Sequence, residues 1–79
     1  MKPLLYYSLL ERTQHGLWQI AFGDYDKAVV VAERDERVQS NRHHNRKLVY
    51  KIAPSIDLQH SIEAVLEIEN VLLNLRSAK

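Results

Sequence analysis

A predicted strand that runs directly into a predicted helix start is the feature that most constrains the fold of this chain. Trp18, Ile20 and Phe22 alternate with smaller or polar neighbours, which is the period of a strand with one buried face. Gly23 then breaks the alternation. Asp24 and Asp26 follow, and their side-chain oxygens can accept hydrogen bonds from the first free N–H groups of a helix. We therefore expect a core-facing strand, a turn and a helix in immediate succession.

The chain has 79 residues, which predicts one domain spanning residues 1–79. A chain this short buries only about 60–65% of the surface that its unfolded form exposes, so its core is thin and a second subunit would add to it. The net charge is +1, from eleven basic and ten acidic side chains. This balance argues against a dedicated nucleic-acid binder, which carries a basic face, and against an acidic DNA mimic.

Cysteine is missing from the sequence, which excludes disulfides, thiolate metal sites and cysteine nucleophiles. The absence fits a reducing compartment. The apolar residues 4–10 are too few for a membrane span and lack a small-residue cleavage site. We therefore expect a cytoplasmic protein without membrane association.

Three segments have the composition of strands. Residues 3–12 form the first, and both of its faces are apolar. A short polar connection with a glycine, typical of a hairpin loop, leads to the second strand at residues 17–22. Residues 48–53 form the third, which Pro54 is expected to end.

Residues 25–39 form the first predicted helix, because their apolar side chains fall on one broad side at 100° per residue. The alternative is a third strand of a meander at residues 28–32, since β-branched runs favour strands. The dense charges of residues 33–37 favour the helix.

The second predicted helix runs from an N-cap at Asp57 to about Arg76, and it carries two adjoining apolar rows. The first row comprises Leu58, Ile62, Val65, Leu66, Leu72 and Leu73. The second row comprises Ala64, Ile68, Val71 and Leu75. Together they cover roughly 220° of the helix, whereas packing on one sheet needs little more than about 100°. The second row is therefore a candidate interface.

These elements predict an α+β fold of order β-β-α-β-α, with a three-stranded, mainly antiparallel sheet and both helices packed on one of its faces. The expected core comprises Leu9, Trp18, Ile20, Phe22, Ala28, Val31, Ala32, Leu48, Tyr50, Ile52, Ile62, Val65, Leu66 and Leu72.

No arrangement of residues indicates catalysis. Asp24 and Asp26 are explained by helix capping and by the helix dipole. The serines lack a nucleophile motif, and two glycines cannot build a phosphate loop. We expect no catalytic residues, no cofactor and no enzymatic activity.

Residues 40–47 are polar and basic, and they predict a loop. Arg42, Arg46 and Lys47 are candidate nucleic-acid contacts through phosphate, and the alternative is a solvated connection. His43 and His44 are adjacent, which does not aim both rings at one ion, so we expect no metal site.

Four segments of the first half of the chain, including the Phe-Gly-Asp-Tyr-Asp turn, carry a resemblance; they are residues 7–12, 16–18, 22–26 and 30–34. They resemble small uncharacterised proteins carried by phages and prophages of Gram-negative bacteria. The resemblance implies an accessory protein of a mobile element in a bacterial cytoplasm, and it assigns no activity.

Together, these observations predict a non-enzymatic protein–protein interaction module. We expect a homodimer formed through the second helix, and a host protein as a further partner. The alternative function is a weak nucleic-acid-binding protein that uses the basic residues 42–47.

Overall fold

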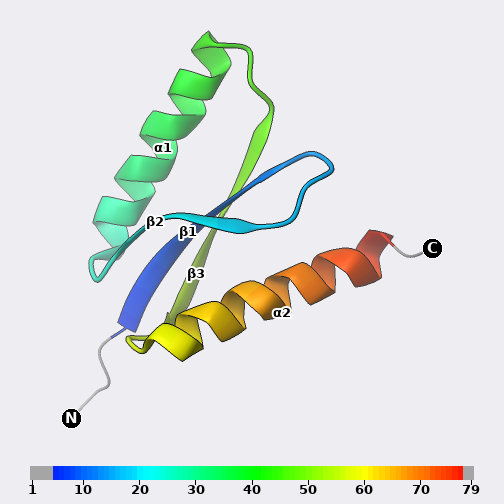
Figure 1. Ribbon diagram of the computed structural model, residues 1–79. Helices are drawn as coiled ribbons and strands as arrows, with labels where there is room; N and C mark the ends of the chain where they lie inside the picture. The colour runs from blue at the N-terminus through cyan, green and yellow to red at the C-terminus, as the bar shows by residue number, and fades with distance from the viewer. Residues whose placement is uncertain (1–4, 78–79) are drawn as a thin grey trace.

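The computed structural model describes residues 5–77 and has the predicted β-β-α-β-α order (Figure 1). The elements are β1 (Leu5–Thr13), β2 (Gln19–Asp24), α1 (Lys27–His43), β3 (Leu48–Ile56) and α2 (Gln59–Ser77). The strand order in the sheet is β2-β1-β3, and β1 is antiparallel to both neighbours. The α+β class and the three-stranded antiparallel sheet are thus confirmed. Residues 3 and 4 of the predicted first strand lie outside the described residues.

The two helices lie on opposite faces of the sheet, so the prediction that both pack on one face is wrong (Figure 1). Successive residues of a strand point to opposite faces. Tyr50 bonds to Asn41 of α1, whereas the next residue, Lys51, bonds to Glu69 of α2. Leu10 belongs to a cluster on which Val65, Leu66 and Leu73 of α2 pack, so it lies on the same face of the sheet as Lys51.

The physical reason lies in β1, whose two faces are both apolar. Leu9 and Leu10 are 0% and 1% exposed. A sheet that is apolar on both faces must be covered on both. Each helix therefore covers one face of a narrow sheet, and each leaves much of its own surface in solvent.

A β-bulge in β2 changes which side chains share a face. Leu9 pairs with Phe22, and Leu10 pairs with Ile20, so Ala21 is the extra residue. Ile20 and Phe22 consequently lie on opposite faces, contrary to the simple alternation of the sequence. Ile20 is 42% exposed, although it was an expected core residue.

Gly23 does not end β2; it pairs with Ser8 inside the strand. The ring of Tyr6 lies across it, and a Cβ at this position would be 2.5 Å from Tyr6 Cζ. The glycine is therefore explained by close packing of an aromatic ring rather than by a turn.

Asp26 caps the start of α1 as predicted, whereas Asp24 bonds to the residue just before the helix. The Asp26 carboxylate accepts from Ala28 N–H at 2.9 Å, and Asp24 Oδ1 accepts from Asp26 N–H at 2.8 Å. Residues 28–32 are helical, so the alternative strand is wrong. The helix continues to His43, and the predicted loop at residues 40–47 is therefore correct only in its second half.

β3 continues through Pro54 to Ile56, contrary to the predicted end of the strand. Proline is tolerated because β3 is an edge strand, and one side of its backbone needs no ladder partner. Asp57 does not cap α2, because the helix begins at Gln59 and Leu58 O accepts the first helical hydrogen bond. The Asp57 carboxylate accepts from Tyr25 Oη–H at 2.7 Å instead.

The core is smaller than the sequence predicts. The buried apolar side chains of the described residues are Leu9, Leu10, Trp18, Val30 and Ala53. Several expected core residues are exposed, namely Ile20, Ala28, Ala32 and Leu72. The remaining expected positions are at least partly buried, among them Phe22, Tyr50 and Ile52.

Candidate functional site

The outer face of α2 carries an uncovered row of apolar side chains. The row comprises Ala64, Ile68, Val71 and Leu75, the second row of the sequence prediction. Ile68, Val71 and Leu75 are 57%, 51% and 66% exposed. We call these four residues the outer row.

The other apolar row of α2 is the one that meets the sheet. Val65, Leu66 and Leu73 are partly buried and pack against the cluster of Leu10, Trp18 and Ala53. Leu58 and Leu72, at the edges of this row, are 50% and 42% exposed. The sheet therefore covers this row only in part, and it does not cover the outer row.

Asn70 fixes α2 to the loop that precedes β2. Its Oδ1 accepts from Trp18 N–H at 2.7 Å, and its Nδ2 donates to Trp18 O at 3.3 Å. The Asn70 side-chain amide thus pairs with both backbone polar groups of Trp18, as a neighbouring strand would in a sheet. The Lys51–Glu69 ion pair, at 2.8 Å, is a second link between sheet and helix. These contacts hold the helix with its outer row in solvent.

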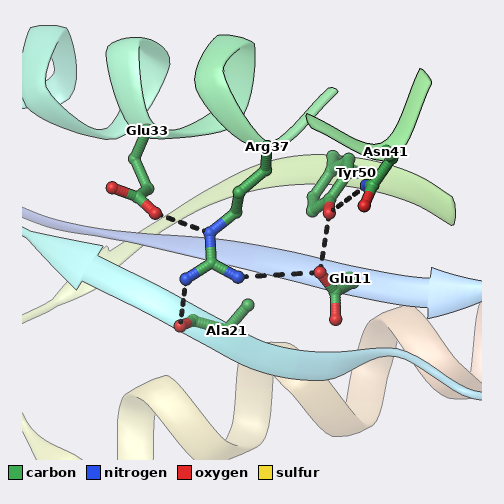
Figure 2. A network of polar contacts seen from close by, with 6 residues as sticks. All are labelled: Glu11, Ala21, Glu33, Arg37, Asn41 and Tyr50. Carbon is green, nitrogen blue, oxygen red and sulfur yellow. Dashed lines mark hydrogen bonds and ion pairs between the residues drawn. The ribbon is translucent and has the colours of Figure 1, made fainter. Parts of the chain in front are cut away.

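A polar network joins α1 to the other face of the sheet (Figure 2). Arg37 Nε donates to Glu33 at 2.6 Å, and Arg37 Nη1 lies 3.7 Å from Glu11 Oε2. Tyr50 Oη donates to Glu11 at 2.7 Å and accepts from Asn41 Nδ2 at 2.7 Å. The hydrogen bond to Glu33 is the main reason that the pKa of Arg37 is raised. These groups bond mainly to one another, so the network connects two layers.

Tyr50 makes the stability of this network dependent on pH. The pKa of the Tyr50 phenol is raised above its ordinary value of 10.0. Burial is the largest cause, and the hydrogen bond to Glu11 is the second. A raised pKa contributes stability that is full below the unfolded pKa and is lost as pH rises through the folded pKa. We expect urea denaturation to show a fall in the free energy of unfolding above about pH 10.

Tyr50→Phe is the control for this pH dependence. It should lower the free energy of unfolding by about 1–2 kcal/mol at neutral pH, because Glu11 and Asn41 each lose a partner. It should also reduce the alkaline fall measured above about pH 10. An unchanged alkaline slope in the variant would assign the fall to other groups.

A cleft of about 240 Å³ lies between the sheet and the last turns of α2. Its charged lining residues are Arg12, Lys51, Glu69 and Arg76. The Arg12 guanidinium lies 5.0 Å from the centre of the Trp18 ring, a cation–π contact. Lys51 is paired with Glu69, so most of the charge in the cleft is already engaged.

The structure places the basic candidates at the end of α1. Arg42 belongs to the last turn of the helix, whereas Arg46 and Lys47 lie in the connection to β3. All three are exposed. His43 and His44 contact each other edge to face, with ring centroids 5.2 Å apart.

Within residues 5–77, no group of three or more His, Cys, Asp or Glu side chains is placed to hold a metal ion. None of the helices in that range is long and apolar enough to cross a membrane.

Sequence reasoning missed the residues that join the layers. The sequence assigned no contact to Asn70, and Arg37 counted only as one of the charged residues 33–37 that favour the first helix. Their partners, Trp18 and Glu11, lie far away along the chain. No local pattern indicates such pairs.

Comparison with known proteins gives no relative: no family model, no curated protein and no solved structure matches the chain.

Proposed function

We propose that this protein is a non-enzymatic protein–protein interaction module that forms a homodimer through the outer row of α2. The observation that carries the proposal is an exposed row without a charged residue. Its spacing of four, three and four positions is that of side chains along a helix–helix seam. A helix of 19 residues is about 28 Å long. The outer row, from Ala64 to Leu75, extends along more than half of this length.

The surface area of the chain supports a second subunit. Its accessible surface is 6047 Å², whereas a folded monomer of 9.2 kDa exposes about 4,900 Å². Its radius of gyration is 13.4 Å, compared with about 12 Å for a compact domain of this length. A fold of one narrow sheet between two helices therefore leaves much surface in solvent, and a second subunit would cover part of it.

Charge complementarity favours an antiparallel pair of helices. The first half of α2 contains Glu63 and Glu67, and Arg76 lies in its last turn. When Ala64 faces the partner's Leu75 across a two-fold axis, Glu63 lies level with the partner's Arg76 along the helix axis, so the acidic half of one helix runs beside the basic end of the other. The helix dipoles also attract each other in this orientation. A parallel pair would place like charges together.

The resemblance of the first half of the chain to phage and prophage proteins supports the biological setting of this proposal. In that setting the dimer is an accessory protein of a mobile element in a bacterial cytoplasm, and it binds and modulates a host protein. The second copy of the chain is the partner to which the outer row is assigned.

The test is the mass of the protein in solution. Sedimentation velocity and light scattering of the wild type should give a concentration-dependent dimer. Val71→Glu with Leu75→Glu should give a folded monomer, because dimerisation would bury unpaired carboxylates at a cost of several kcal/mol. Both positions are exposed, so circular dichroism should remain that of the wild type.

A charge-matched control is available at two polar positions of the same helix. Gln59→Glu with Asn74→Glu adds the same charge at exposed positions away from the outer row, and it should remain dimeric. A monomeric wild type, or a Val71→Glu/Leu75→Glu variant with the mass of a dimer, would contradict the proposed interface.

A further inference from the structure

The charges of this chain are distributed unevenly, although the net charge is only +1. Between Glu36 and Asp57 the sequence contains no carboxylate side chain. The same segment carries cations at the end of α1 and in the connection that follows. We call Arg42, His43, His44, Arg46 and Lys47 the basic turn. An even overall balance therefore coexists with a local positive surface, which is the quantity that matters for binding a polyanion.

The backbone of the basic turn is held by hydrogen bonds. Asn45 has a φ of 59°, in the left-handed region that Asn tolerates. Its N–H donates to Arg42 O at 3.2 Å, and the N–H of Arg46 donates to Asn41 O at 2.7 Å. This pair of bonds is the Schellman arrangement that ends many helices. Arg42 and Arg46 are therefore presented from a fixed turn, which lowers the entropy lost on binding.

The arginine and lysine side chains of the basic turn have no carboxylate partner within the described residues. Within residues 5–77, Arg42, Arg46 and Lys47 form no ion pair, whereas Arg34, Arg37 and Lys51 each pair with a carboxylate. The dipole of α1 explains a cation in its last turn. It does not require two further cations after the helix has ended.

We propose that the basic turn binds the phosphate backbone of single-stranded nucleic acid. Arg42, Arg46 and Lys47 supply the phosphate contacts. The exposed rings of His43 and His44 lie among them, and imidazole rings can stack on unpaired bases. Bases within a duplex are already stacked, so a single strand matches this combination of groups better.

Binding is tested by fluorescence anisotropy with a labelled single-stranded oligonucleotide of mixed sequence, titrated with the full chain. Three phosphate contacts predict a slope of about −2 in a plot of log K against log salt concentration. The dissociation constant should be of the order of 10⁻⁵ M at low salt. A chain that does not bind at low salt would overturn the proposal.

Arg42→Gln with Arg46→Gln should weaken binding at least about tenfold and reduce the salt slope to about −0.7. The matched control is Lys27→Gln with Arg34→Gln, which removes the same charge from the other part of α1 and should bind like the wild type. Equal losses in the two variants would show a diffuse charge effect and reject the basic turn as the site.

His43→Ala with His44→Ala tests the choice of a single strand. It should weaken binding to the single strand about tenfold and leave the weaker binding to a duplex of the same sequence unchanged. Tighter binding to the duplex or to heparin would reject the single-strand assignment. These outcomes are separate from self-association, because Arg42→Gln/Arg46→Gln should keep the mass of the wild type.

Discussion

Replacement of Leu10 with alanine should lower the free energy of unfolding by about 2–5 kcal/mol. Leu10 is 1% exposed and lies in the cluster through which α2 packs on the sheet. A domain of this length has a total stability of only about 4–12 kcal/mol. Urea denaturation should therefore show an unfolding midpoint well below that of the wild type.

Leu9→Ala is the matched control on the opposite face of the same strand. Leu9 is 0% exposed, and the total loss of stability should be similar. Trp18 lies in the cluster of Leu10, so the emission of the folded protein should change in Leu10→Ala and stay native in Leu9→Ala. A loss below about 1 kcal/mol for Leu10→Ala, or identical emission changes in the two variants, would contradict the separate packing of the two layers.

Asn70→Leu should have the second large effect, a loss of about 2–4 kcal/mol. The substitution keeps the size of the side chain but leaves both Trp18 N–H and Trp18 O without their partner. Each polar group that loses its partner costs about 1–3 kcal/mol. Urea denaturation measures the loss, and the amide proton resonance of Trp18 should shift in the folded fraction.

Asn74→Leu makes the same chemical change one turn later on α2, at an exposed position. It should change stability by no more than about 0.5 kcal/mol. If Asn70→Leu were equally harmless, the two hydrogen bonds to Trp18 would not hold the helix, and the orientation of the outer row would need another cause.

The parts of the fold that depend on local signals were predictable from the sequence. The cap at Asp26 marks the start of α1, and the periodicity of residues 57–76 marks α2 to within two residues at its start. The apolar character of both faces of β1 was also visible. Both helices were nevertheless predicted on one face, because periodicity indicates which side of a helix is buried and does not indicate which face of the sheet the helix covers.

The bulge at Ala21 explains why the strand prediction failed in detail. One extra residue reverses the face of every side chain before it in the strand. No residue type in this segment indicates that a bulge is present. The predicted end of β3 at Pro54 was wrong for another reason. Proline lacks an N–H for the ladder, but on an edge strand that N–H needs no partner.

The outer row was predictable because its side chains lie at angles of the helix that face away from the sheet, and Ala64, Ile68, Val71 and Leu75 are all exposed. Its use as an interface stays a prediction.

The position of β1 between β2 and β3 has a consequence for the order of events during folding. β2 follows β1 after a short loop, so this hairpin can close within about 1–10 μs. β3 is separated from β1 in the sequence by β2 and the whole of α1. Pairing β1 with β3 therefore closes a longer loop, and the entropy cost of this closure precedes the hydrogen bonds of the ladder. We expect the pairing of Leu5–Thr13 with Leu48–Ile56 to be the rate-limiting step, so substitutions in β3 should slow folding more than equally destabilising ones in β2.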